Sequence, residues 1–416
     1  MARLLVRYHG WGEQWLLGTL AHNGRDMLFE YAPGALRQGL ELSPLHLKLQ
    51  PQAFAPFAAH LHGLPGLLAD ALPDGWGLLL MDRLFRQQGL DVAAVSPLQR
   101  LAFIGHRAIG ALVFEPAQPW AQCDDAHTLL ALAQQTRQVL AGEGAAVLKQ
   151  LAWLGGSPQG ARPKVLVQMH PVSGDVMTGL ADESPPGFEP WLVKFPAQGE
   201  HAEACAIEAL YASLARRCGL DMPPPRHIEL GPRLAAFAVR RFDREAGQRV
   251  PVHTLAGSLH ADFRLPGAVD CTTWLRVARM FTRDEREVQK AFERVLFNVL
   301  FNNRDDHAKN LSFHLGRDRC WRVAPAYDLT FAHGAGGEHA MDVCGHGRDI
   351  TRAHLLQLAA QGGVGAKSAS AAMERMAVVA ASLRAEASHW PIRKASVVRM
   401  AAAVGRNLDL WSTSVN

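Results

Sequence analysis

The chain has 416 residues, of which 48% are hydrophobic and 20% charged, the ordinary composition of a globular protein. Lys and Arg number 43 against 39 Asp and Glu, and a net charge of +4 is too small to indicate a nucleic-acid or membrane partner. No apolar run is long enough for a transmembrane helix, and Arg3 and Arg7 interrupt the N-terminus too early for a signal peptide. We therefore expect a soluble, cytoplasmic protein with two or three domains or lobes.

The six cysteines form no Cys-x-x-Cys pair, and in a chain of this length we interpret them as scattered reduced thiols. A glycine-rich stretch holds a group of candidate metal ligands: His333, His339, Cys344 and His346. Their spacing fits no zinc template, and a glycine-rich loop would hold its ligands poorly. We therefore disfavour a metal site in this stretch.

Residues 1–118 have the pattern of a mixed unit in which short strands, such as residues 15–20, come before helices. Ser96 is expected to begin a helix, because a Ser N-cap is followed by Pro97 and, three residues after the cap, by Gln99. Residues 110–116 read as a strand that closes the unit, and the prolines and polar residues after it mark a boundary.

Residues 119–240 are predicted to form a second unit, with strands at 164–169, 191–195 and 234–239. A helix over 202–218 should end at Gly219. Residues 241–416 are predicted to be mainly helical, with one long amphipathic helix that carries apolar side chains from 288 to 300 and ends at Asn302. The predicted fold class is α+β.

The segment after this helix is the most informative part of the sequence. Asp305 and Asn310 are five residues apart, and Asp328 follows an expected hairpin in which residues 311–315 and 321–323 alternate around a turn. Phosphoryl transfer from ATP needs a carboxylate for the attacking hydroxyl, and a second carboxylate and an amide for magnesium. Protein kinases use this order and spacing. An Asn-rich, solvated turn is the alternative, but it does not explain the second Asp at the end of a hairpin.

A kinase also needs a lysine on a strand, paired with a glutamate on a helix. Lys194 lies in an otherwise apolar strand, where an unpaired ammonium would be costly to bury. Glu208 in the next helix is our candidate for its partner, and Glu203 is the rival.

A glycine-rich loop over residues 155–164 precedes the first strand of this second unit. It matches neither a P-loop, because Ala161 and Arg162 follow Gly160, nor a nucleophile elbow. Its backbone amides could still cradle a phosphate, with Arg162 or Lys164 adding charge.

With these segments in place, the chain resembles the HipA family, the serine/threonine-kinase toxins of bacterial toxin–antitoxin systems. In the first unit the resemblance lies in residues 72–75 (Leu-Pro-Asp-Gly) and in residues 101–112. In the rest of the chain it lies in residues 160–164, 192–196, 241–244, 305–310 and 324–328.

The resemblance implies a two-lobed, protein-kinase-like fold, with an accessory subdomain over 1–118, a nucleotide-binding lobe over 119–240 and a helical lobe over 241–416. It implies ATP and Mg²⁺ as cofactors, Asp305 as catalytic base, Asn310 and Asp328 as magnesium ligands, and Ser157 as an autophosphorylated serine. The implied nucleotide contacts are Gln159, Gly160, Ala161, Arg162, Pro163 and Lys164 in the loop, Lys194, the hinge residues Arg240, Arg241 and Phe242, and His307, Lys309, Asn310, Tyr327 and Asp328.

The family also implies partners: a HipB-like helix-turn-helix antitoxin, operator DNA bound only through that antitoxin, and a protein substrate such as an aminoacyl-tRNA synthetase. Two segments depart from the family pattern. Many relatives have an acidic residue at the hinge position of Arg240, and residues 253–263 differ from the usual sequence after the hinge. These departures put the adenine contacts and the substrate in doubt.

Three other functions stay open. A small-molecule kinase would share the spacing of Asp305 and Asn310. A non-catalytic scaffold for a DNA-binding antitoxin would account for Arg240. Direct nucleic-acid binding through Arg276, Arg279 and Arg283 ranks last, because a solvated helical face explains these residues much better.

Overall fold

The computed structural model describes residues 3–118, 126–144, 146–155, 158–178 and 184–412. The chain divides into two compact units. The first unit contains Met1–Ala202, Arg226–His253 and Gly257–His260; the second contains Glu203–Pro225, Thr254–Ala256 and Ala261–Asn416. Residues 1–118 and most of 119–240 thus fall in one compact unit, and the finer division into three parts stays a prediction.

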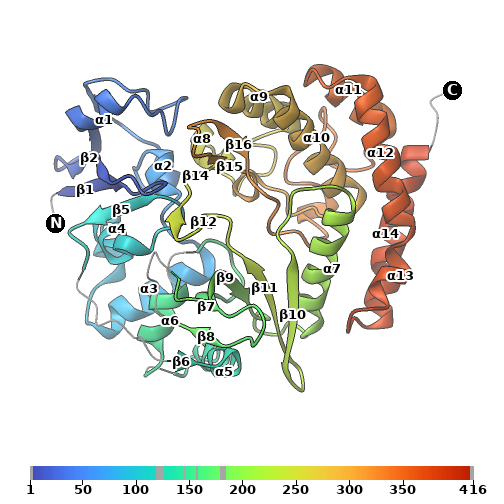
Figure 1. Cartoon of the computed structure of the whole chain (residues 1–416), viewed down its shortest axis with the longest axis horizontal. Coiled ribbons are helices and arrows are strands. Elements are labelled where there is room, and N and C mark those ends of the chain that lie inside the picture. Colours follow the sequence, from blue (N-terminus) through green and yellow to red (C-terminus); the bar gives the residue numbers. More distant parts are fainter. Residues whose placement is uncertain (1–2, 119–125, 145, 156–157, 179–183, 413–416) are drawn as a thin grey trace. The chain divides into compact units, whose positions relative to one another are not determined.

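The first unit contains an antiparallel five-stranded sheet in the order β4-β3-β2-β1-β5, of which β1, β2 and β5 are labelled in Figure 1. Its strands are β1 (Arg3–Tyr8), β2 (Trp15–His22), β3 (Met27–Tyr31), β4 (Ala53–Phe54) and β5 (Leu112–Glu115). The helices that accompany it are α1 (Pro33–Gln38), α2 (Gly66–Ala69), α3 (Gly75–Gln87) and α4 (Pro97–Ile104). The predicted start of α4 is confirmed, because Ser96 and Gln99 form a reciprocal capping box.

A second sheet of the first unit has the order β10-β11-β9-β7-β8-β6. Its strands are β6 (Ala126–His127), β7 (Lys164–Met169), β8 (Val176–Met177), β9 (Glu189–Lys194), β10 (Pro225–Gly231) and β11 (Leu234–Arg240), and α5 (Leu129–Leu140) and α6 (Leu148–Gly155) lie between β6 and β7 in the chain. Every residue of β7 is buried, as its run of apolar residues predicts for a central strand. The three predicted strands of this region are confirmed.

A buried carboxylate joins this unit together after β11. Asp243 receives hydrogen bonds from the guanidinium groups of Arg241 (2.8 and 2.7 Å) and Arg244 (2.8 Å), and from the backbone N–H of Gly110 (3.0 Å). Burial alone would raise the pKa of Asp243, but the two arginines hold that pKa well below its usual range. The segment 241–244 therefore joins the end of one sheet to the loop before β5. The short strands β12 (Arg244–Glu245), β13 (Gln248–Arg249) and β14 (Val252–Thr254) follow it.

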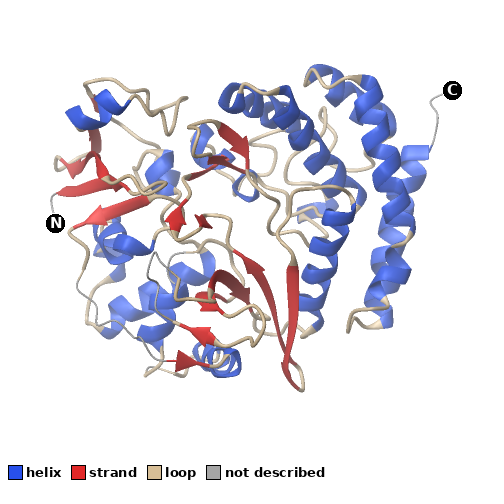
Figure 2. Ribbon diagram, in the orientation of Figure 1, coloured by secondary structure: helices blue, strands red, loops and turns tan. Residues whose placement is uncertain are grey.

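The second unit is mainly helical, as expected (Figure 2). Its long helices are α7 (Glu203–Arg217), α9 (Cys271–Thr282), α10 (Glu285–Leu300), α11 (Arg352–Gln361), α12 (Ala366–Ala381) and α14 (Lys394–Ser412), with α8 (Leu255–Leu259) at the boundary and the short α13 (Leu383–Ala387). The predicted amphipathic helix is α10, whose apolar residues Val288, Phe292 and Leu296 are fully buried. It packs against α9, α12 and α14 and is the central element of this unit.

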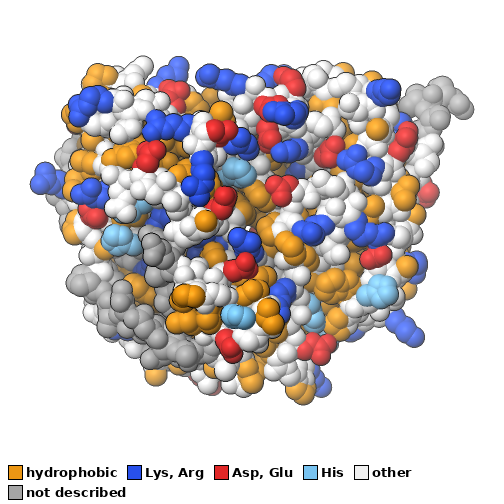
Figure 3. All heavy atoms as spheres, in the orientation of Figure 1, with side chains coloured by type: hydrophobic (Ala, Val, Ile, Leu, Met, Phe, Trp, Pro, Cys, Tyr) orange, Lys and Arg blue, Asp and Glu red, His pale blue; other side chains and the backbone are white. Residues whose placement is uncertain are grey.

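Positive and negative side chains are interspersed over the face of the molecule that Figure 3 shows, in keeping with the small net charge. Among the described residues, no helix is both long and apolar enough to cross a membrane.

We predict that Asp243→Ala lowers the free energy of unfolding by about 3–5 kcal/mol, because it leaves two buried guanidinium groups without their carboxylate. Asp318, which pairs with Arg322 on the surface, is the matched control, and its replacement by Ala should cost at most about 1 kcal/mol. Urea denaturation measures both. Since the folded pKa of Asp243 lies below its unfolded value of about 3.9, its contribution is present above that pH and is lost as the pH falls further. Equal losses of unfolding free energy in Asp243→Ala and Asp318→Ala would contradict the structural role assigned to Asp243.

Candidate active site

The polar segment after α10 leaves the helix in a fixed direction. Asn302 has a left-handed backbone (φ 55°), which Asn tolerates better than most residues, and its side chain donates to the carbonyl of Ala332 (2.9 Å). Asn303 donates from its backbone and from its side chain to Asn298 on α10 (2.9 Å each). The two asparagines therefore fix the backbone at the end of α10, where the polar segment begins.

Two adjacent acids in this segment have opposite environments. The side chain of Asp305 is 63% exposed. Asp306 is buried and accepts a hydrogen bond from the backbone N–H of Ala340 (2.8 Å), and its other oxygen lies 2.8 Å from Nδ1 of His339. Asp306 thus fixes the loop to the segment 339–340, and Asp305 is left accessible.

Three other predicted site residues, Asn310, His307 and Lys309, lie in the loop of Asp305. The side-chain amide of Asn310 donates to the carbonyl of Asp305 (2.8 Å) and closes the loop. Nε2 of His307 lies 3.8 Å from a carboxylate oxygen of Asp305, and its Nδ1 is buried with no hydrogen-bond partner among the described residues. The ammonium of Lys309 lies 4.6 Å from the ring centre of Phe263, which also contacts His307.

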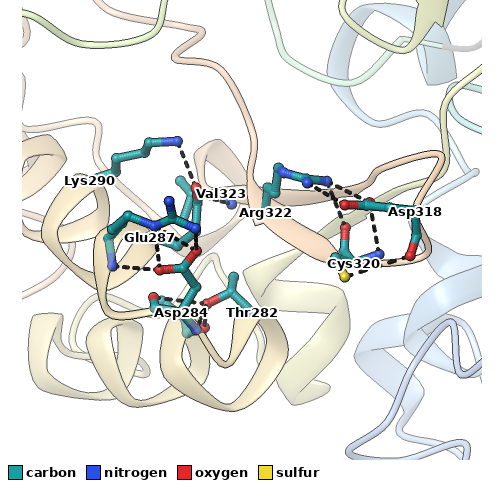
Figure 4. A network of polar contacts seen from close by, with 10 residues as sticks. Thr282, Asp284, Glu287, Lys290, Asp318, Cys320, Arg322 and Val323 are labelled. Carbon is teal, nitrogen blue, oxygen red and sulfur yellow. Dashed lines mark hydrogen bonds and ion pairs between the residues drawn. The ribbon is translucent and has the colours of Figure 1, made fainter.

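The predicted hairpin is confirmed as β15 (Ser312–Leu315) and β16 (Trp321–Val323). A bidentate ion pair between Arg322 and Asp318 stabilises its turn (Figure 4). Glu287 of α10 accepts from the backbone N–H of Val323 (2.8 Å) and pairs with Lys290 (2.6 Å). The hairpin is therefore anchored to α10, the helix that precedes the loop of Asp305.

The segment after the hairpin is also held on both sides. The backbone N–H of Ala326 donates to the backbone carbonyl of Asp221 (2.6 Å), and the hydroxyl of Tyr327 donates to the carbonyl of Lys309 (2.9 Å). Asp328 has a left-handed backbone (φ 54°), a conformation that costs energy for a residue other than glycine and is concentrated at functional sites. Tyr327 thus connects the segment of Asp328 to the loop of Asp305.

A buried guanidinium on α10 supplies charge to this region. Burial lowers the pKa of Arg294 to about 10, and the charges of Tyr327, Asp221 and Asp328 oppose this shift. Sequence reasoning missed Arg294, as it missed the pairing of Asp306 with His339, because no spacing rule connects these residues.

In the first unit, two lysines of the predicted site lie opposite each other. Lys164 on β7 pairs in register with Lys194 on β9, and both are buried. Directly opposed residues of an antiparallel pair point to the same face of a sheet. Two ammonium groups on one face of a sheet are a candidate binding site for an anion. Phe237 on β11, next in register, lies under Lys194 with its ring centre 5.8 Å from the ammonium.

The glycine-rich loop lies directly before Lys164. The ammonium of Lys164 donates to the carbonyl of Gln159, and Arg162 pairs with Glu200 (3.0 Å). The described part of the loop is therefore folded back on the start of β7. Ser157, the predicted autophosphorylation site, lies outside the described residues.

Glu203, the rival partner for Lys194, has partners of its own in the second unit. Arg393 donates to it from the backbone (2.8 Å) and from the side chain (2.8 Å), and the hydroxyl of Ser396 donates as well (2.9 Å). Burial alone would raise the pKa of Glu203, but these bonds lower it to about 2. Glu208 is buried on the same helix, and its pairing with Lys194 stays a prediction.

The hinge residues have local partners in the first unit. Arg240 lies 3.5 Å from Glu189 on the neighbouring strand, and the backbone N–H of Arg241 donates to the carbonyl of Pro190 (2.9 Å). The guanidinium of Arg241 is engaged by Asp243, so an adenine contact from this residue would have to come from its backbone. The roles of Arg240, Arg241 and Phe242 in nucleotide binding stay predictions.

Known families match both parts of the chain. The HipA N-terminal domain matches residues 9–115, and the HipA-like C-terminal domain matches residues 156–384, more than half of the 416 residues. The chain belongs to the HipA family. All the motifs that suggested this resemblance fall within the two matched regions. The segment 241–244 of the C-terminal match also contacts the N-terminal match, through the hydrogen bond from Gly110 to Asp243.

HipA of Shewanella oneidensis MR-1, solved in a complex of HipA, HipB and operator DNA, has a similar structure with a TM-score of 0.70. The match covers 98% of this chain and 96% of that one at 17% sequence identity, and it confirms the predicted α+β, kinase-like fold. A kinase-named protein of Sinorhizobium fredii (strain NBRC 101917 / NGR234), Y4mE, is 29% identical over 277 residues. That alignment spans 59% of this chain and 60% of the relative.

We predict that Asp305→Ala leaves the free energy of unfolding within about 0.5 kcal/mol of the wild type, because Asp305 is exposed. Asp306→Ala should lower it by about 1–3 kcal/mol, because the buried carboxylate of Asp306 is removed and the N–H of Ala340 loses its acceptor. Thermal or urea denaturation distinguishes the two. A destabilised Asp305→Ala with an unchanged Asp306→Ala would reverse the roles assigned to these neighbours.

Proposed function

We propose that this chain is an ATP-dependent protein kinase that transfers the γ-phosphate to a serine or threonine hydroxyl. The supporting observation is the loop of Asp305. A buried neighbour, Asp306, fixes the backbone, while Asp305 itself stays accessible beside the amide of Asn310. A general base must reach the proton of its substrate, and an exposed carboxylate on a rigid loop meets that requirement.

In this proposal Asp305 orients and accepts the proton of the attacking hydroxyl. Asn310 and Asp328 would hold magnesium, which neutralises the phosphates when bound. No group of three or more His, Cys, Asp or Glu side chains suited to a metal occurs in the part of the chain that the structure describes. Magnesium is commonly bound by one or two carboxylates, with phosphates and water completing its shell.

The nucleotide phosphates would be bound by cationic and N–H groups. Lys164 and Lys194 place two ammonium groups on one face of the sheet in the first unit. In the second unit, Lys309 and His307 both contact the ring of Phe263, and the buried Nδ1 of His307 has no hydrogen-bond partner among the described residues. A buried polar atom without a partner calls for a ligand or water, and a phosphate oxygen would supply an acceptor for a protonated Nδ1. The loop from Gln159 to Lys164 would cover the phosphates.

Membership of the HipA family supports an antitoxin as the binding partner of this chain. The related Shewanella protein is in complex with HipB and operator DNA. We infer that this chain likewise binds a HipB-like helix-turn-helix antitoxin and reaches DNA only through it. The protein substrate would belong to the translation machinery, with aminoacyl-tRNA synthetases the first class to test, and Ser157 would be the site of autophosphorylation.

We expect the wild type, incubated with γ-labelled ATP and Mg²⁺, to incorporate label into protein. Asp305→Ala should reduce this rate by about 10²–10⁴-fold, because the general base is lost. Asp318→Ala, an exposed acid on the turn of the adjacent hairpin, should label like the wild type. Autoradiography of the gel gives the rate, and peptide mass spectrometry shows whether Ser157 carries the phosphate.

Three other outcomes would contradict parts of this proposal. Equal labelling of the wild type and Asp305→Ala would remove Asp305 from its role. Phosphate recovered on an added amino alcohol or aminoglycoside, with none on protein, would identify a small-molecule kinase. Failure of the wild type to bind Mg–ATP would favour a non-catalytic scaffold for the antitoxin.

A further inference from the structure

The helix α3 begins with an aspartate that does not cap it. Asp74 occupies the N-cap position, where Asp normally accepts a hydrogen bond from the second or third residue of its own helix. Its side chain makes no such bond. Instead, its Oδ1 accepts from the backbone N–H of Gly160, in the glycine-rich loop 86 residues away in the sequence. The carboxylate of Asp74 therefore contacts the glycine-rich loop and does not cap its own helix.

The neighbours of Asp74 contact the same loop. The backbone N–H of Trp76 donates to the carbonyl of Gly160 (3.1 Å), and its indole N–H donates to the carbonyl of Lys164 (3.0 Å). In return, the side-chain amide of Gln159 donates to the carbonyls of Asp70 (2.7 Å) and Leu72 (3.3 Å). Residues 70–76, which we call the loop clamp, therefore bind both ends of the segment 159–164.

Two glycines allow this close approach. A Cβ at Gly75 would lie 2.6 Å from Cα of Ala161, and the residue has a left-handed backbone (φ 44°). A Cβ at Gly77 would lie 3.1 Å from the carbonyl oxygens of Gly155 and Pro158. Clamp and loop thus meet backbone to backbone, which makes the contact geometrically specific.

The loop clamp is itself anchored. The carboxylate of Asp70 lies 2.7 Å from Nδ1 of His253, and Nε2 of His253 lies 3.0 Å from the hydroxyl of Ser43. His253 and Ser43 are fully buried. The backbone N–H of Gly66 donates to His260 (3.0 Å). Residues 253 and 260 belong to the segment after the hinge that departs from the family pattern. The clamp therefore connects that segment to the loop.

The same N-terminal region also holds the helix that leads into the loop. Arg107 donates to the carbonyls of Ala152 (3.2 Å) and Trp153 (2.9 Å) near the end of α6, and its guanidinium lies over the rings of Phe103 and Trp153. A cation at the C-terminus of a helix is favourable because the exposed carbonyls there carry partial negative charge. The entrance of the loop and its exit are thus fixed by one region of the chain.

We propose that the loop clamp holds the glycine-rich loop in the conformation that binds the nucleotide phosphates, with Asp74 as the positioning residue. This rests on the proposed kinase function. A loop rich in glycine has many accessible conformations, and ordering it on binding costs affinity. A loop that is already ordered by Asp74 and Trp76 binds phosphate without that cost. The N-terminal region then acts on ATP affinity without contacting ATP.

The test uses the full-length chain with Asp74→Ala, Asp74→Asn and the control Asp91→Ala. Asp91 caps a short helix of the same region by accepting from Ala93. Hydrogen–deuterium exchange of the peptide that contains residues 158–166 reports the loop in the absence of nucleotide. Titration calorimetry with Mg–ATP gives the Kd.

We expect faster exchange in this peptide and an approximately tenfold higher Kd for Asp74→Ala, the effect of one lost hydrogen bond. Asp74→Asn keeps an acceptor oxygen and should stay within about threefold of the wild type in both measurements. Asp91→Ala should match the wild type.

Unchanged exchange in Asp74→Ala would overturn the clamp. Faster exchange with an unchanged Kd would overturn its role in nucleotide binding. A wild type that fails to bind Mg–ATP would overturn the proposed kinase function and the nucleotide role with it, while the exchange data would still decide whether Asp74 orders the loop.

Discussion

The hydrogen bond from the backbone of Gly160 to Asp74 shows the constraint on which this molecule depends. A glycine-rich loop has few side chains to pack, so its conformation must be fixed by contacts from outside. Here the contacts come from residues 70–76, far away in the sequence, and they continue through Asp70 to His253. The first unit is therefore organised around the loop, and two segments that read as separate in the sequence become one compact structure.

In the second unit, the loop of Asp305 is fixed by polar contacts of a buried carboxylate. This loop is polar and cannot be held by apolar packing, so the structure buries one acid and exposes the next. Asp306 is satisfied by Ala340 and His339, which offsets the cost of its burial. Asp305, in contrast, keeps its side chain 63% exposed. A buried carboxylate thus holds the loop in place, and the exposed one next to it is the residue to which we assign the proposed chemistry.

Much of the fold could be predicted from local patterns. The capping box of Ser96, the apolar face of α10 and the alternation in β15 and β16 are signals carried by a few consecutive residues, and each is confirmed. The partners of the site residues could not be predicted in this way. Glu203 binds Arg393, which is 190 residues away, and no spacing rule expresses such a contact. The sequence identified residues 72–75 and 241–244 as family motifs. Only the structure shows that Asp74 and Asp243 connect segments that are far apart in the chain.

This distinction changes how the departures from the family pattern are interpreted. Arg240 at the hinge was the main sequence argument for a non-catalytic scaffold. In the structure it lies 3.5 Å from Glu189 on the adjacent strand, so its positive charge has an acidic neighbour. Both side chains are partly exposed, and a pair of this kind contributes little to stability. It does neutralise the extra positive charge locally. Arg240 therefore no longer distinguishes a scaffold from a kinase, and the decision between them depends on the chemistry of Asp305 and its neighbours.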